Sequence, residues 1–155
     1  MNKMVWLLLI FVFLLLLIII FLSRLDKANL YKARELLTEN EKEFFNRLIL
    51  ALPNHYVFPQ VALGAILEPN ARKNTRKFWR ARASFSQKIA DYVVCDNDLK
   101  IVAIIELDDR THNQGKDQKR DAMLDKAGYR VIRWKSKSKP DIEQIQNKLK
   151  DNISD

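Results

Sequence analysis

The chain is poor in the two residue types from which many metal sites are built. Its 155 residues include one cysteine, Cys95, and two histidines, His55 and His112. A zinc site made of cysteine and histidine uses roughly four such ligands, so this class of site is excluded. A single cysteine also excludes a disulfide within the chain and agrees with a reducing compartment.

Glycine and proline are absent from residues 4–37. Segment 23–37 is therefore not a flexible linker, and we expect it to be a polar, helical stalk. Beyond the apolar N-terminus the chain has no internal repeat and no low-complexity region. It also contains nothing that resembles a zinc finger or a helix-turn-helix, so no sequence-reading element is predicted.

What the chain does have is an unbroken apolar run of 19 residues, Met4 to Leu22. As a helix this run is roughly 28 Å long, about the thickness of the hydrocarbon core of a bilayer. We therefore predict a transmembrane helix. A cleaved signal peptide is the alternative, but its apolar region is usually shorter and ends at a small-x-small site, which Phe21 to Arg24 do not provide.

Basic residues around this run predict its orientation. Lys3 precedes it, and four basic residues follow it closely, namely Arg24, Lys27, Lys32 and Arg34. Because basic flanks stay in the cytoplasm, we expect the N-terminus outside and the rest inside, in a single-pass protein of the inner (cytoplasmic) membrane. The expected organisation is an anchor at 1–24, a juxtamembrane stalk at 25–37 and one domain at 38–152.

The chain has an excess of positive charge, with 27 Lys and Arg against 19 Asp and Glu. Setting Lys3 aside leaves 26 against 19, a formal charge of +7. This balance favours nucleic acid or anionic lipid as a partner. Anionic headgroups account for the basic residues next to the anchor, but less well for a second cluster further along.

The second cluster has six basic residues within eleven positions, interleaved with Phe78 and Trp79. Its members are Arg72, Lys73, Arg76, Lys77, Arg80 and Arg82. In one interpretation these residues bind phosphates while Trp79 stacks on a base. In the other, Phe78 and Trp79 cap the core beneath a solvated loop.

The remaining pattern predicts an α/β domain whose mixed sheet is flanked by helices. Thr38 and Glu41 form a capping box at the start of a helix that ends before Pro53. The elements expected after it are an edge strand at 56–63, two strands at 89–95 and 100–107, a helix at 116–127 closed by Gly128, a strand at 129–134 and a helix at 140–150. The two middle strands are apolar on both faces, which places them at the centre of the sheet.

Carboxylates gather at the ends of these middle strands. Alternation along a strand puts Glu106 and Asp108 on one face. If Cys95 pairs with Lys100 in an antiparallel hairpin, Asp91 lies opposite Ile104 on that same face. Hard carboxylate oxygens suit Mg²⁺ or Mn²⁺, so the pattern predicts a divalent-metal hydrolytic site. The alternative is a strand end with solvated acids.

The order of these elements resembles the restriction-endonuclease-like superfamily, with its α-β-β-β-α-β PD-(D/E)XK core. More narrowly it is similar to an uncharacterised bacterial domain family akin to domains related to very-short-patch-repair endonucleases. The residues that carry the resemblance are Leu37, Thr38, Glu41, Phe44, Phe45 and Leu48; Phe58 to Val61; Ala90 to Cys95; Ile105 to Asp109 with His112; Gln118, Arg120, Asp121, Leu124 and Gly128; and Val131 to Arg133.

The resemblance implies that Asp91 and Glu106 bind the metal and that Glu41 is an auxiliary acid. Its capping role is an equally good interpretation of Glu41. Asp108 stands where the superfamily usually has a lysine. Replacement cations are Lys88, Lys119 and Arg120, although the last two also suit ion pairs along their own helix. His112 has three open roles: ligand, base or phosphate contact.

Together these observations predict a membrane-anchored, Mg²⁺- or Mn²⁺-dependent nuclease that hydrolyses phosphodiester bonds, with DNA expected before RNA. Two rivals stay open. One is a non-catalytic nucleic-acid-binding module on the same fold, because the usual lysine is missing. The other is a membrane-associated adaptor protein whose positive charge serves anionic lipid. A fold alone does not choose among them.

Overall fold

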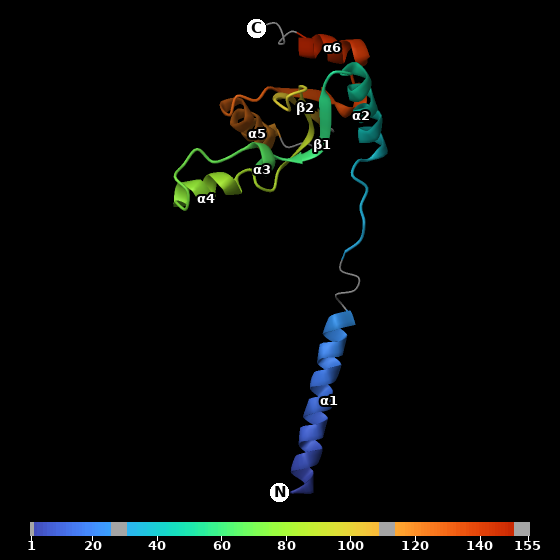
Figure 1. Cartoon of the computed structure of the whole chain (residues 1–155), viewed down its shortest axis with the longest axis vertical. Helices are drawn as coiled ribbons and strands as arrows, with labels where there is room; N and C mark the ends of the chain where they lie inside the picture. The colour runs from blue at the N-terminus through green and yellow to red at the C-terminus, as the bar shows by residue number, and fades with distance from the viewer. Residues whose placement is uncertain (1, 26–30, 109–113, 151–155) are drawn as a thin grey trace. The chain divides into compact units, whose positions relative to one another are not determined.

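A computed structural model describes residues 2–25, 31–108 and 114–150, and of residues 24, 25 and 114–119 it describes the backbone only. The chain divides into two compact units, residues 1–35 and residues 36–155. Figure 1 shows both, coloured along the sequence. Each unit is described by itself below.

The first unit is built on one helix, α1 (Lys3–Leu25). Its stretch Lys3–Ser23 has a mean hydropathy of 3.6 and is long and apolar enough to cross a membrane. The expected helical stalk is wrong over residues 31–37, which contain no helix. Tyr31 and Leu36 are exposed there. A short polar segment gains little from propensity alone, since tertiary packing supplies most helical stability.

The second unit contains a four-stranded mixed sheet in the order β1-β2-β3-β4. Its strands are β1 (Tyr56–Ala62), β2 (Ile89–Cys95), β3 (Ile101–Asp108) and β4 (Val131–Lys135). Neighbouring strands are antiparallel except for β3 and β4, which are parallel. The mixed α/β fold is therefore confirmed, as is the central place of the two apolar strands.

Helices cover both faces of this sheet (Figure 1). On the first face, α2 (Glu39–Ala51) and α6 (Ile142–Lys150) pack on alternate strand residues such as Tyr92 and Ile105. On the second face, α3 (Leu63–Ile66) and α5 (Gln114–Lys126) pack on Val93 and Ile104. On β3, Glu106 and Asp108 alternate with the first-face residues Ile105 and Leu107, so these two acids belong to the second face.

The termini of α2 and α5 follow the sequence signals. Thr38 accepts a hydrogen bond from Glu41 N, and the Glu41 carboxylate accepts one from Thr38 N at 2.7 Å, which completes the capping box. Gly128 has φ of 82° after α5, and Tyr129 N donates to Leu124 O at 3.0 Å. Both predicted caps are confirmed.

The hairpin between β2 and β3 has a different register from the expected one. Cys95 pairs with Ile101 rather than Lys100, and a bulge at Val94/Cys95 shifts the pairing once more, so that Tyr92 faces Ile105. The expected pairing of Asp91 with Ile104 is therefore wrong. The turn at Asp96 and the bulge each add one residue. Two such shifts preserve the face on which each side chain lies.

The basic cluster is a loop only at Arg72 and Lys73, and its other members are helical. Residues Arg76–Ala83 form helix α4, and Thr75 caps it by accepting a hydrogen bond from Phe78 N at 3.2 Å. Smaller differences concern boundaries: Leu63 begins α3, Gln114 begins α5, and the 3₁₀ turn Ser136–Ser138 follows β4. The expected loop 109–115 lies outside the described residues up to 113.

Candidate functional site

The central strands lose their regular pairing at one end, and the candidate site lies there. The last recorded pair of β2 and β3 is Tyr92 with Ile105, although β2 begins at Ile89 and β3 continues to Asp108. Beyond that pair, Leu107 N donates to the Asp91 carboxylate at 2.8 Å. A side chain thus takes the place of a backbone acceptor, and the Asp91 carboxylate lies at the end of β3.

Glu106 is the buried acid of this site. It is 2% exposed, and no other charged residue in the described ranges is buried. Its Oε2 lies 2.9 Å from Nη2 of Arg120 on α5. Its Oε1 is buried without a hydrogen-bond donor among the described side chains. Burial raises the pKa of Glu106 from 4.5 to about 8, because a carboxylate without full solvation resists ionisation.

Asp91 and Glu106 act on each other electrostatically. Burial raises the pKa of Asp91, the hydrogen bond from Leu107 lowers it, and the charges of Glu41 and Asp108 raise it again. The Asp91 charge in turn raises the pKa of Glu106. Neighbouring carboxylates with raised pKa values are stabilised in their ionised form by a cation between them.

Arg133 ties three elements together around these acids. It lies on β4 level with Glu106 of β3. Its Nη1 donates to Asp108 at 2.6 Å, and its Nε and Nη2 donate to the carboxylate of Asp121 on α5 at 2.9 and 2.7 Å. The Asp121 hydrogen bonds raise the pKa of Arg133 most strongly. We call this set the Arg133 bridge; it fixes α5 against the sheet.

Sequence analysis does not predict Arg133 as a site residue. Arg133 and its partner Asp121 appear there only among the residues that carry the family resemblance. One signal was available, because an arginine after two apolar residues in a short strand needs an acid to accompany it into a half-buried position. The partner depends on the parallel pairing of β3 and β4, which no local pattern provides.

The other predicted catalytic residues differ in how far they meet Asp91 and Glu106. Asp108 lies on the same face, with its carboxylate held by Arg133. Arg120 meets Glu106 directly. The Glu41 carboxylate is engaged in the capping box, so the structure favours its capping role, although its charge still acts on Asp91. His112 and the side chain of Lys119 lie outside the described residues.

The acids of the site have a donor set that bears on divalent-ion binding. No group of three or more His, Cys, Asp or Glu is placed to hold a metal within the described ranges. Mg²⁺, however, commonly uses one or two protein carboxylates together with waters and substrate phosphate. Two carboxylates on adjacent strands, one with a buried oxygen that lacks a donor, fit that requirement.

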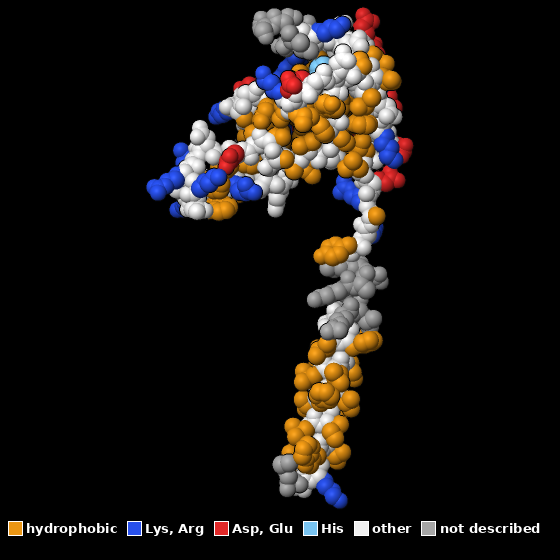
Figure 2. All heavy atoms as spheres, viewed as in Figure 1, with side chains coloured by type: hydrophobic (Ala, Val, Ile, Leu, Met, Phe, Trp, Pro, Cys, Tyr) orange, Lys and Arg blue, Asp and Glu red, His pale blue; other side chains and the backbone are white. Residues whose placement is uncertain are grey.

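The predicted nucleic-acid-binding residues all lie on or next to α4 and are exposed, namely Arg72, Lys73, Arg76, Lys77, Trp79, Arg80 and Arg82. Figure 2 shows basic side chains gathered there. Phe78 is buried, whereas Trp79 is 54% exposed. The core-capping interpretation therefore holds for Phe78 and is wrong for Trp79.

These features define a mixed α/β domain, preceded by an apolar helix, with a buried, arginine-paired glutamate and two partly buried aspartates where its central strands separate. The chain belongs to the family described as Protein of unknown function (DUF2726), whose model matches residues 33–153. No curated protein and no solved structure matches the chain.

Proposed function

We propose that the DUF2726 domain of this chain has a restriction-endonuclease-like fold and is a metal-dependent nuclease acting on DNA in preference to RNA. The observation that carries the proposal is the pair of Asp91 and Glu106 at the separated ends of β2 and β3. Glu106 Oε1 is buried without a donor among the described residues, and burial raises the pKa of its carboxyl group to about 8. Such an acid is typical of a functional site.

Each residue of the site has a separate role in the proposed reaction. Asp91 and Glu106 would hold Mg²⁺ or Mn²⁺, and the hydrogen bond from Leu107 N orients the Asp91 carboxylate for this purpose. The bound ion would supply an activated water and stabilise charge on the scissile phosphate. The fold contributes a half-buried setting in which water competes weakly with these charges.

Asp108 stands where the superfamily usually has a lysine, so the proposed reaction needs positive charge from another residue. We assign that role to Arg120. Its guanidinium lies 2.9 Å from Glu106. An arginine stays protonated and is therefore no general base, but it binds phosphate oxygens through a planar set of donors. Arg120 would stabilise the charge that develops on the phosphate, while the Arg133 bridge holds α5 in position.

We further propose that α1 anchors the chain in the inner membrane with its N-terminus outside and the domain in the cytoplasm. Its length and hydropathy support a membrane span. The excess of basic residues after the span supports this orientation. The nuclease would then act on nucleic acid close to the membrane surface.

The proposed activity is tested on the full chain in a nonionic detergent, with supercoiled plasmid, linear DNA and RNA as substrates. We expect nicking or degradation with Mg²⁺ or Mn²⁺ that stops with chelator. Glu106→Gln and Asp91→Asn should each lower the rate on the order of 100-fold. Glu143→Gln is the matched control, because Glu143 is exposed on α6, which covers the first face. Full activity of Glu106→Gln would refute the assignment.

A second function has specific support, namely a nucleic-acid-binding module without catalysis. Arg120 already forms an ion pair with Glu106, and Arg133 forms one with Asp108. In this case the acids would be a structural ion-pair network rather than a metal site. Salt-sensitive binding with no cleavage under any divalent ion would favour the module.

A further inference from the structure

Residues 69–88, which we call the basic arm, contain no acidic residue. They include seven basic ones, Arg72, Lys73, Arg76, Lys77, Arg80, Arg82 and Lys88. All of these are exposed except the half-buried Lys88. Within the described residues, the one ion pair of the arm joins Lys73 to Glu68 at 3.5 Å, between two exposed side chains. Such pairs contribute little to stability. Nearly all of the arm's positive charge is therefore exposed to solvent and available to a binding partner.

The arm also presents one aromatic ring. Trp79 is 54% exposed on α4, next to the buried Phe78. The two rings meet edge to face, with centroids 5.2 Å apart. Phe78 therefore supports the indole on one side, and the Thr75 cap fixes the start of the helix that carries it. A supported, exposed ring costs little entropy to order when a ligand stacks on it.

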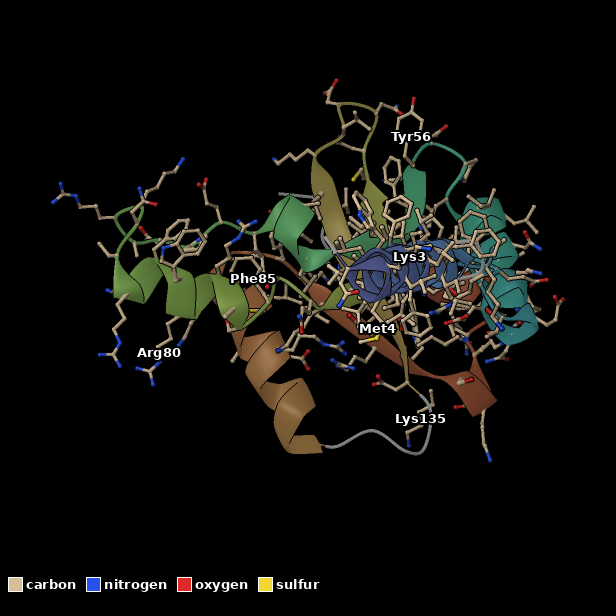
Figure 3. The ribbon with its side chains drawn as sticks, turned by 90° about the horizontal axis from the view of Figure 1, so that it is seen from below. Lys3, Met4, Tyr56, Arg80, Phe85 and Lys135 are labelled. Carbon is tan, nitrogen blue, oxygen red and sulfur yellow. The ribbon has the colours of Figure 1, made fainter. Side chains whose placement is uncertain are left out.

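The arm is attached to the sheet face that carries Glu106 and Asp108. Phe85, just after α4, belongs to the second-face cluster. Ser84 Oγ lies 3.8 Å from Met123 Sδ on α5, the helix that also carries Arg120. Figures 1 and 3 both show this end of α4 beside α5, and in Figure 3 the labelled Arg80 extends away from the sheet.

We propose that the basic arm binds single-stranded nucleic acid, with its basic side chains on the phosphates and a base stacked on Trp79. The inference rests on the proposed nuclease function, since it names the substrate class of the same site. An exposed indole stacks on a base whose face is free, and in a duplex those faces are covered by neighbouring base pairs. Basic residues alone would bind duplex and single strand alike.

A basic composition also suits a lipid surface, but the arm lacks the apolar stripe of an interfacial helix. Such helices bury a continuous row of apolar residues in the membrane. On α4 the large apolar residues are Phe78, which is buried, and Trp79, the one exposed large hydrophobic of the arm. A single ring among cations matches base stacking better than insertion.

The test uses the full chain in nanodiscs of neutral phosphatidylcholine, with chelator present so that binding is read without cleavage. Fluorescence anisotropy measures the affinity for a labelled oligo-dT and for a duplex of equal length. Trp79→Ala should weaken oligo-dT binding roughly 5- to 100-fold. Duplex binding should change less than about 2-fold. Trp79→Phe should keep most of the oligo-dT affinity that Trp79→Ala loses.

A charge series separates the arm from general electrostatics. The variant Arg76→Gln/Lys77→Gln/Arg80→Gln should reduce the salt dependence of oligo-dT binding by a slope of about 2, at roughly 0.7 per phosphate contact. A matched control, Lys100→Gln/Lys137→Gln/Lys148→Gln, removes the same charge from exposed sites outside the arm. The control should leave the slope close to that of the wild-type chain.

Any of four results would overturn the inference. Trp79→Ala could leave the oligo-dT affinity unchanged, or could weaken duplex and single-strand binding equally. The two triple variants could show equal salt-dependence slopes, or neither oligonucleotide could bind. In that case, a Trp79-dependent emission shift confined to phosphatidylglycerol discs would assign the arm to lipid. If the chain binds oligo-dT but does not cleave it when Mg²⁺ is added later, only the nuclease proposal is refuted. If the chain cleaves nucleic acid but its binding does not depend on the arm, only this inference is refuted.

Discussion

At the scale of single residues, the account depends on how Glu106 is accommodated. A carboxyl group that is 2% exposed should either be neutral or be fully paired. Arg120 pairs with one of its oxygens, and the other has no donor among the described residues. The residue therefore carries an electrostatic cost that a bound cation would remove.

This cost predicts a dependence of stability on pH. The folded pKa of Glu106 is about 8, whereas its ordinary value is 4.5. Between these values the folded state holds the proton more tightly, so stability is lost as pH rises from about 5 to 9. We expect the melting temperature in chelator to fall more steeply over this range for the wild-type chain than for Glu106→Gln, by at least about 2 °C.

The comparison uses slopes, because Glu106→Gln also removes the partner of Arg120 and lowers stability at every pH. Mg²⁺ should flatten the wild-type profile and leave that of the variant unchanged. Parallel profiles for the two proteins in chelator would contradict the placement of Glu106.

The Arg133 bridge gives a second prediction at this scale. Arg133→Gln leaves Asp108 and Asp121 without their shared cation, and its side chain is only 22% exposed. We expect a loss of about 1–3 kcal/mol in the free energy of unfolding by urea. Lys73→Gln, which removes an exposed pair, should change stability by less than about 0.5 kcal/mol. Equal effects of the two substitutions would show that the bridge does not stabilise the fold.

At the scale of elements, features that depend on local sequence, such as helix caps, were predicted well, and contacts across the sheet were not. Thr38 with Glu41 and the glycine after α5 are local patterns, and both predicted caps are confirmed. Helix α4 was missed because its eight residues include only two large apolar side chains, Phe78 and Trp79. The stalk was expected to be helical from composition alone, which gives no account of tertiary support.

The register of β2 and β3 shows the same limit. The turn residues predicted the hairpin, but the bulge at Val94/Cys95 has no sequence signature here. The two register errors cancel in parity, so they leave the prediction of a common face for Asp91 and Glu106 unchanged. The packing of α5, β3 and β4 creates the Arg133 bridge and the pairing of Arg120 with Glu106. Local sequence patterns do not predict such contacts.

Two glycines of the domain, Gly64 and Gly128, provide a prediction about these elements. Gly128 has φ of 82°, with open space around an added Cβ, so Gly128→Ala is strained by its backbone alone. We expect it to cost about 1–2 kcal/mol. Gly64→Ala is the matched control, since its nearest contact, Ser86 Cα, lies at an ordinary 3.9 Å. It should be neutral or stabilising by up to about 1 kcal/mol in urea unfolding.

At the scale of the whole molecule, the proposal combines an apolar helix with a basic domain. The expected consequence is a tethered protein. The full chain should stay with membranes through washes in high salt and alkaline carbonate, because burial of α1 in lipid does not depend on charge. A chain lacking residues 1–24 should be released by high salt.

Orientation is read in the same material. Protease added to inverted inner-membrane vesicles should digest the domain, and protease added to intact spheroplasts should not. Digestion only in spheroplasts would contradict the proposed topology, and release of the full chain by salt alone would contradict the anchor.

The central claim is that Asp91 and Glu106 hold a divalent ion between the separated ends of β2 and β3. It is tested most directly by anomalous diffraction from crystals soaked in Mn²⁺. We predict a peak bound by carboxylate oxygens of both residues at about 2.1–2.2 Å. A Mn²⁺-saturated crystal without density between the two carboxylates, and with Arg120 still paired to Glu106 as in the metal-free protein, would contradict it.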